Sequence, residues 1–164
     1  DGSVSVDPII CSPEIKSLLE NRLLLLYTGL TRSSNTILRK QNKSIKKSLA
    51  TRDSLDHMVD LAYKMRESLN NNSLKEFGKY LDENWVLKKK MTEDISSKQI
   101  DKWYSIVKRK GAEGGKILGA GGGGFFLAYA KVRYHDRILS ALRDLRPTEF
   151  VFEPQGSKII FVSE

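Results

Sequence analysis

Cysteine, histidine and long apolar runs are all scarce in this sequence. Its single cysteine, Cys11, cannot form an internal disulfide, which fits a reducing compartment. The two histidines, His57 and His135, have no second ligand at the spacing of a metal site. No apolar stretch approaches the ~20 residues that a membrane-spanning helix requires. These absences exclude a disulfide scaffold, and they predict a soluble, cytoplasmic protein with no membrane partner and no metal site of its own.

Negative charge is also in short supply. The 164 residues include 28 Lys and Arg against 20 Asp and Glu, which gives a net charge of +8. This excess favours anionic partners, among them nucleotides, sugar phosphates, nucleic acid and membrane surfaces, and it does not choose between them. Hydrophobic residues make up 40% of the chain, which is enough for one sizeable core.

The first strands are predicted from short apolar patterns. Val4 and Val6 alternate with polar residues up to Pro8, which is typical of a half-buried strand. Because this strand has no preceding partner and the first residue is not Met, we expect the sequence to be a piece of a longer protein. Apolar residues fill positions 23–27 and Gly29 closes the run, which predicts a strand buried on both faces.

Helices are predicted for most of residues 31–111. Thr31, Ser33 and Ser34 are each suited to cap the first of them. The next helix, over 52–69, carries one apolar stripe at spacings of three and four residues. The stripe consists of Leu55, Met58, Val59, Ala62, Met65 and Leu69.

Two capping patterns place the next two helices. Ser73 with Glu76 forms a capping box ahead of an apolar face, and Ser96 with Gln99 repeats the pattern. Gly111 is expected to end the second of these helices. The apolar residues that follow the two patterns are Leu74, Phe77, Leu81 and Trp85, then Ile100, Trp103, Tyr104 and Val107.

Strands are predicted to dominate the last third of the chain. The predicted strands cover 115–118, 125–130, 149–153 and 158–164, the last two as a hairpin, and a helix over 133–145 stops before Pro147. Strands at both ends of a helical block predict an α+β fold. We expect a mostly antiparallel sheet with helices packed on one face, in a split-βαβ order.

A run of glycines stands between two of these strands. Gly119–Gly124, with Ala120 inside it, matches G-x-G-x-x-G. A dinucleotide site needs a helix after the glycines, and a Walker loop needs Lys followed by Ser or Thr, whereas Phe125 opens a strand. The catalytic sequences of protein kinases are absent. The run therefore predicts a loop that binds an anion or admits another backbone, with a plain glycine hairpin as the alternative.

Several basic residues are suited to phosphate. Arg32, with the hydroxyls of Thr31 and Ser33, stands where a strand meets a helix N-terminus, which suits an anion or ordinary capping. Lys116 precedes the glycines, and its side chain points either toward them or away. The remaining basic runs are interpreted as solvated helix faces, over residues 39–47 and 88–90.

The stretch GAEGGKILGAGGGGFF, residues 111–126, resembles the third conserved motif of the GHMP kinases, small-molecule kinases named for galactose, homoserine, mevalonate and phosphomevalonate. LLLLYTGLTRSS from Leu23 and ENWVLKKKM from Glu83 resemble the sugar-kinase branch that includes D-glycero-D-manno-heptose 7-phosphate kinase. The resemblance implies a ferredoxin-like GHMP kinase C-terminal domain with additional helices over 29–164. Residues 1–28 would be remnant strands of the N-terminal kinase domain.

The activity implied by this resemblance is Mg²⁺-dependent transfer of the ATP γ-phosphate to a heptose 7-phosphate or a related sugar, at the anomeric hydroxyl. Thr31, Arg32, Ser33 and Lys116 would lie at the substrate site. The catalytic base and the Mg²⁺ ligands would belong to the missing N-terminal half, so no catalytic residue is assigned and the chain alone is expected to be inactive. A homodimer also stays open. The positions beside the phosphate loop of that half would be Gly119, Ala120, Gly121, Gly122, Gly123 and Gly124.

Two alternatives from other classes of protein stay open. The charge and the sequence GGFFLAY suggest an RNA-binding module. However, Phe125 and Phe126 are adjacent and must point to opposite faces of a strand, so we do not expect nucleic acid as a partner. A non-catalytic assembly domain of similar α+β fold also fits the sequence, because the catalytic half is not present to inspect.

Overall fold

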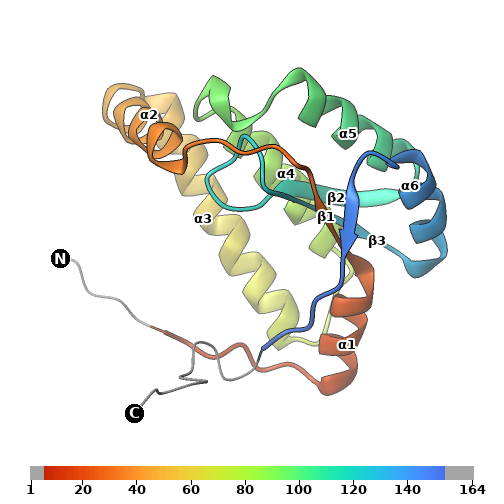
Figure 1. The fold of residues 1–164 in the computed structure, drawn as a ribbon. Helices are drawn as coiled ribbons and strands as arrows, with labels where there is room; N and C mark the ends of the chain where they lie inside the picture. The colour runs from red at the N-terminus through yellow and green to blue at the C-terminus, as the bar shows by residue number, and fades with distance from the viewer. Residues whose placement is uncertain (1–5, 154–164) are drawn as a thin grey trace, which may run out of the picture.

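The computed structural model describes residues 6–153 (Figure 1). The predicted strand 158–164 and most of the strand expected around Val4 lie outside these residues. The elements are α1 (Pro13–Arg22), β1 (Leu23–Tyr27), α2 (Ser34–Lys47), α3 (Leu49–Asn70), α4 (Phe77–Lys89), η1 (Glu93–Ile95), α5 (Lys98–Arg109), β2 (Ala112–Ile117), β3 (Phe125–Ala130), η2 (Val132–Tyr134), α6 (His135–Ala141) and β4 (Arg146–Thr148). Within these residues, no helix is long and apolar enough to cross a bilayer.

Four strands form one antiparallel sheet in the order β2-β3-β1-β4. Leu26 of β1 lies opposite Phe126 of β3 on one side and opposite Pro147 of β4 on the other. The predicted α+β class with an antiparallel sheet is confirmed. Because β1 lies between β3 and β4, the strand at 23–27 is hydrogen-bonded into the same sheet as the later strands. An N-terminal-domain origin for residues 1–28 stays a prediction.

Side chains on the two faces of β3 join two separate apolar clusters. Phe126, Ala128 and Ala130 point to one face, where α5 and α6 supply the larger cluster. Tyr129 points to the other face and packs with α1, the C-terminal end of α3 and the start of α4. The buried members of the smaller cluster are Leu19, Leu69, Leu74, Phe77, Leu81 and Tyr129.

Two glycines let helix α4 approach strand β2 to backbone contact. A Cβ atom on Gly114 would lie 2.2 Å from the carbonyl oxygen of Gly78, and one on Gly78 would lie 2.4 Å from Cβ of Glu113. No residue larger than glycine fits either position without moving the helix. This contact sets the height of α4 above the sheet, and with it the place of Lys88 in the last turn of that helix.

The predicted N-termini of two helices need correction. α4 begins at Phe77 with Glu76 as its N-cap, so the capping box at Ser73 is wrong, and Ser73 instead accepts a hydrogen bond from the N–H of Lys75 in a turn. The N-cap of α5 is Ser97, whose hydroxyl oxygen accepts from the N–H of Ile100. Ser96, the predicted cap, lies one residue too early.

The last helix and the last described strand also differ from the prediction. α6 ends at Ala141, because Leu142 takes a non-helical ψ of 47°. The strand that follows is Arg146–Thr148, and the predicted strand 149–153 is wrong. Pro147 is tolerated in this strand because β4 is an edge strand, where a missing N–H leaves no ladder bond unmade.

Candidate functional site

Residues 118–124, here called the glycine loop, connect β2 to β3 and have a backbone that only glycine adopts readily. Gly119, Gly121, Gly122 and Gly124 have φ angles between +73° and +105°. A side chain at a positive φ is strained, since its Cβ crowds the backbone. Much of the glycine run is therefore required by the path of the hairpin itself.

The glycine loop also packs against two segments of its own chain. The N–H of Gly122 donates to the carbonyl of Ile95 in η1 at 2.9 Å, and the N–H of Gly124 donates to the carbonyl of Leu30 at 2.8 Å. A Cβ on Gly123 would lie 2.4 Å from that same Leu30 oxygen. The prediction that a bare backbone admits another loop is thus met within the chain, where the segment leading into α2 lies beside the loop (Figure 1).

Other amides of the glycine loop have no acceptor in the described part of the chain. Among residues 6–153, the N–H groups of Gly119, Ala120 and Gly121 make no hydrogen bond, and these residues are exposed or half-buried. Successive free N–H groups in a turn of this kind form a concavity of positive potential. The loop can therefore still bind an anion while its second half is held against the rest of the domain.

Arg32 lies beside the glycine loop. Its Cγ would lie 3.3 Å from a Cβ on Gly122. Its guanidinium is exposed and makes no ion pair within the described part of the chain. Ser33, the N-cap of α2, also leaves its hydroxyl unused at the helix N-terminus, and Thr31 is exposed beside it. With respect to residues 6–153, the three predicted residues thus offer a free guanidinium and free hydroxyls at the positive end of a helix.

Thr28 fixes the segment that carries Arg32. This residue is buried, and its hydroxyl donates to the carbonyl of Gly124 at 2.7 Å while accepting from the N–H of Leu30 at 3.2 Å. The backbone N–H of Thr28 donates to the same Gly124 carbonyl. Thr28 was assigned no role from the sequence, although its place between the strand and Arg32 was a usable signal.

Two lysines lie where the glycine loop begins. The ammonium of Lys116 donates to Oδ1 of Asn84 at 3.0 Å, and that of Lys88 donates to the carbonyl of Gly119. Burial lowers the pKa of Lys88, and burial together with the charge of Lys88 lowers the pKa of Lys116 to about 8. Lys116 therefore lies on the α4 side of the loop.

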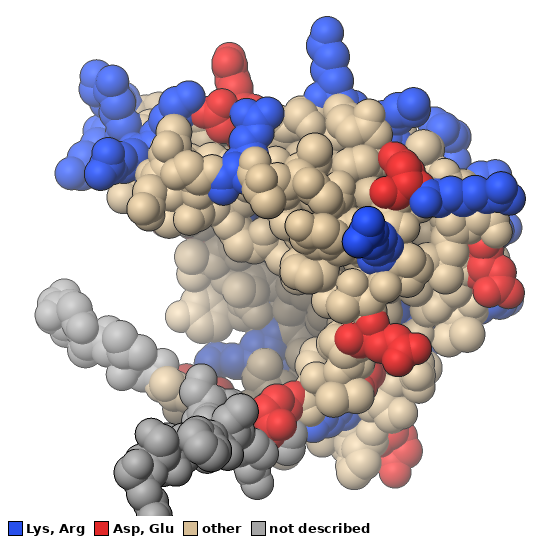
Figure 2. All heavy atoms as spheres, in the orientation of Figure 1, with Lys and Arg blue, Asp and Glu red and all other residues tan. Residues whose placement is uncertain are grey.

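The basic runs were interpreted as solvated faces, and that interpretation is only partly right. Lys90 is exposed and Lys89 pairs with Asp101 at 3.0 Å, but Lys88 is partly buried against the glycine loop. Residues 39–47 do face solvent on one side of α2, and Figure 2 shows their basic side chains gathered at that end of the molecule.

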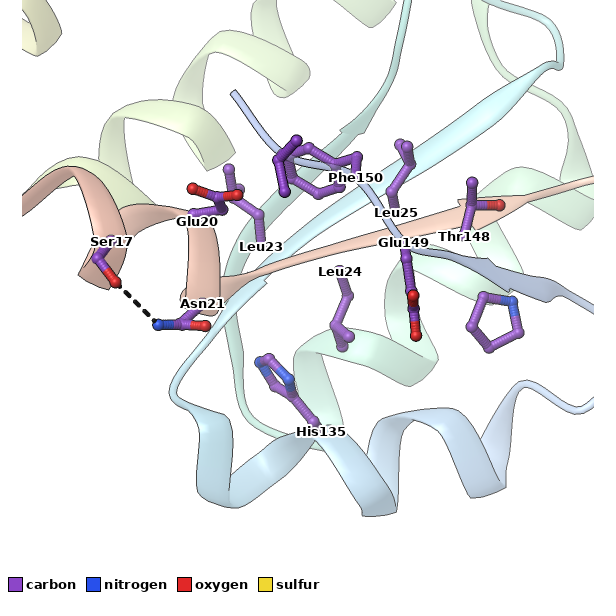
Figure 3. A pocket seen from close by; sticks show the side chains of 12 residues that line it. Ser17, Glu20, Asn21, Leu23, Leu24, Leu25, His135, Thr148, Glu149 and Phe150 are labelled. Atoms are coloured by element: carbon purple, nitrogen blue, oxygen red, sulfur yellow. Dashed lines mark hydrogen bonds between the residues drawn. The ribbon is translucent and has the colours of Figure 1, made fainter. Parts of the chain in front are cut away.

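A hollow among the described residues lies away from these side chains. It measures about 750 Å³ and opens near the N-terminal end of β1, between α1, α6 and the chain after β4 (Figure 3). Asn21, Glu149 and His135 line it, but His135 is already bonded to the carbonyl of Ala130. None of the predicted site residues lines this hollow, whereas the glycine loop meets the segment after the C-terminal end of β1.

Two further kinds of site find no support in the described residues. No three His, Cys, Asp or Glu side chains in residues 6–153 gather closely enough to hold a metal ion, so these residues do not fit a Mg²⁺ site.

Phe126 is fully buried and Phe125 packs on Tyr27 with ring centroids 5.3 Å apart. Strand β3 therefore does not present two aromatic rings on one open face for RNA bases.

Comparison with known proteins identifies the family. Residues 65–146, half of the chain, match the family described as GHMP kinases C terminal. The chain therefore belongs to the GHMP kinase C-terminal domain family, as the resemblance of its glycine motif predicted.

Two curated relatives are kinases. The bifunctional fucokinase/GDP-fucose pyrophosphorylase of Arabidopsis thaliana is 33% identical over 129 residues, which cover 78% of this chain and 12% of that protein. The D-glycero-alpha-D-manno-heptose 7-phosphate kinase of Campylobacter jejuni is 30% identical over 160 residues, 94% of this chain and 46% of that protein. The chain thus spans less than half of the length of either relative.

A solved structure shares the fold. The mevalonate kinase of L. major, crystallised with R-mevalonate, superposes with a TM-score of 0.69 at 21% identity, over 76% of this chain and 40% of that chain. At this identity the likeness is one of fold alone.

Proposed function

We propose that this chain is the C-terminal part of an ATP-dependent GHMP-type kinase that phosphorylates a sugar phosphate. The proposal rests on one observation. Arg32, which forms no ion pair among the described residues, packs beside Gly122 of the glycine loop, and the first N–H groups of this loop have no acceptor among those residues. Free amides and a guanidinium are the groups that bind phosphoryl oxygens without needing a metal. The kinase relatives support the same class of reaction.

The residues have distinct roles in this proposal. The N–H groups of Gly119, Ala120 and Gly121 would bind phosphate oxygens of ATP, and Arg32 would grip the anionic group of the sugar. Ser33 and Thr31 would add hydroxyl contacts near the helix N-terminus. We propose a heptose 7-phosphate or a related sugar as acceptor, with transfer to its anomeric hydroxyl. Bound Mg²⁺ would neutralise the phosphates of ATP and would be held outside the described residues.

Catalysis in this scheme rests on positioning. Held by Thr28 and Ile95, the glycine loop would not need to reorganise as charge develops on the transferred phosphoryl group. No general base is assigned to this chain, so we expect the isolated 164-residue polypeptide to show no kinase turnover. ATP-dependent phosphorylation of a sugar by that polypeptide would refute the expectation.

The site itself is tested in an enzyme that joins this chain to a phosphate-loop half. Arg32→Ala should raise the KM for a phosphorylated sugar more than the KM for ATP, because one charge-assisted contact to the acceptor is lost. Arg39→Ala, an exposed arginine further along α2, is the matched control and should change neither KM. An unchanged acceptor KM in Arg32→Ala would remove Arg32 from the site.

A further inference from the structure

Two lysine ammonium groups converge at the start of the glycine loop, away from the contact with Arg32. Arg32 packs against Gly122, whereas Lys88 donates to Gly119 at the β2 end of the loop. Lys116 donates to Asn84, which lies one turn before Lys88 on α4 and so faces the same side of that helix. The loop therefore has cationic groups at both of its ends.

Among the residues that the structure describes, the two lysines have no negative partner. In residues 6–153, their hydrogen bonds run to neutral oxygens, the carbonyl of Gly119 and the amide of Asn84, and neither forms an ion pair. Neighbouring lysines behave differently. Lys89 pairs with Asp101, and Lys108 pairs with Asp82 at 3.1 Å.

Two like charges held together and partly buried destabilise each other unless an anion joins them. The lowered pKa of Lys116, about 8, agrees with this arrangement, since burial and the charge of Lys88 are its causes. The N–H groups of Gly119 and Ala120 have no acceptor in the described residues and belong to the same stretch of backbone. An oxyanion bound there would supply the missing negative charge and accept these bonds at once.

We propose that Lys88 and Lys116, together with the N–H groups of Gly119 and Ala120, form a second anion subsite that takes a phosphoryl group. The inference rests on the proposed function, because it divides one loop between two phosphate-bearing molecules. Arg32 holds the anionic group of the acceptor, and the lysine pair binds a phosphate of the donor. Lys88 is then a binding residue as well as a tether for the loop.

The experiment uses inorganic phosphate as the probe and the 164-residue chain with labelled lysines and amides. NMR titrations give the dissociation constant of phosphate and the pKa of each lysine. Lys88→Met and Lys116→Met keep the aliphatic stem and remove the charge, and each should weaken phosphate binding about tenfold, as expected for one charge-assisted hydrogen bond. In the unmodified chain, phosphate should raise the pKa of Lys116 toward its ordinary range.

Two controls make the result specific. Lys90→Met removes a neighbouring exposed charge and should leave the phosphate affinity unchanged. Amide spectra of every variant report whether the fold is intact. Equal affinity in Lys116→Met and Lys90→Met would overturn the proposal. The proposal would also be overturned if the loop signals move in Lys88→Met while its phosphate affinity stays the same, because Lys88 would then only hold the loop in place.

Arg32→Ala separates this inference from the proposed function. Loss of phosphate binding in the lysine variants, with binding kept in Arg32→Ala, supports two subsites. Equal loss in all three variants means a single shared site and overturns the second subsite, while the kinase proposal stands on its own test. If the lysine subsite binds phosphate but Arg32→Ala leaves the acceptor KM unchanged in the joined enzyme, the proposed role of Arg32 fails and the subsite remains.

Discussion

Gly123→Ala is expected to separate the glycine loop from the segment that carries Arg32. The new Cβ would lie 2.4 Å from the carbonyl oxygen and 2.9 Å from the carbonyl carbon of Leu30, and this backbone has no flexible end that can move aside. Restoring an ordinary contact pulls the loop outward and stretches the 2.8 Å hydrogen bond from Gly124 to Leu30. The lost bond costs about 1 kcal/mol. The overpacking adds roughly 1–3 kcal/mol.

Gly119→Ala is the matched control within the same loop. A Cβ on Gly119 would have nothing within 4 Å of it, so the cost of the substitution comes from a φ of +73° alone. Left-handed backbone costs an alanine about 1–2 kcal/mol, of which roughly 0.4–1 kcal/mol is regained from the stiffer unfolded chain. We therefore expect Gly123→Ala to destabilise the domain by about 2–4 kcal/mol and Gly119→Ala by about 1 kcal/mol.

Urea unfolding followed by circular dichroism measures both variants, and amide exchange of Gly124 reports the bond to Leu30 directly. Exchange at Gly124 should accelerate in Gly123→Ala and stay close to the wild-type rate in Gly119→Ala. If the two variants lose equal stability, or if Gly124 remains protected in Gly123→Ala, close backbone contact does not hold the loop in place.

Two other predictions concern neighbours of the loop. The pKa of Lys116 is about 8 in the folded chain, which is below its value in the unfolded chain. Between pH 8 and about 10.4 the unfolded chain therefore binds more protons than the folded chain, and the free energy of unfolding should increase with pH over this range. Lys116→Met should remove this increase in stability with pH. At pH 7 it should stabilise the domain by about 1–2 kcal/mol, after allowance for the partial exposure of the side chain. If stability still increases by the same amount in the variant, Lys116 is not the source of the increase. Thr28→Val removes the 2.7 Å bond to Gly124 and leaves the N–H of Leu30 without its acceptor, which should cost about 1–3 kcal/mol in urea unfolding. The exposed control Thr31→Val should stay within about 0.5 kcal/mol of the wild type, and an equal loss in both would show that the buried hydroxyl of Thr28 has no special role.

The strands of the sheet were largely predictable because their apolar runs are short and continuous. The predicted bounds of β1 and β3 are confirmed. Gly29 follows the apolar run of β1, and the glycine loop directly precedes the apolar run of β3. β4 was missed because Pro147 argues against a strand, whereas residues 149–153 contain a short apolar run between two glutamates, which is typical of a strand. Which segment forms hydrogen bonds with the open edge of β1 depends on tertiary structure, and in this fold that segment is β4.

Helix α1 was not foreseen, although its signal is present. Ser12 caps it, with a hydroxyl oxygen 3.3 Å from the N–H of Ile15, and Pro13 occupies the first position. Only Leu19 is buried along this helix, so the apolar periodicity that identifies the other helices is weak.

The candidate site was predictable in part, from motif resemblance together with position along the chain. Arg32 was assigned to the substrate site and the glycines to the phosphate site, and the structure brings Arg32 into contact with Gly122. The place of Lys88 could not be foreseen, because it depends on how closely α4 sits on β2. That distance is set by Gly78 and Gly114, and nothing in a helical sequence pattern reveals it.

The central place of β1 has a consequence for how the domain comes together. Arg22, the last residue of α1 directly before this strand, donates a hydrogen bond to the hydroxyl of Tyr129, 107 residues further along the chain. Because β1 separates β3 from β4, the middle of the sheet cannot close until the chain has been synthesised as far as β4, which ends at Thr148. Long-range pairing of this kind slows folding. A shortened version that begins after Tyr27 would leave β3 and β4 without the strand that joins them, and we expect such a version to aggregate.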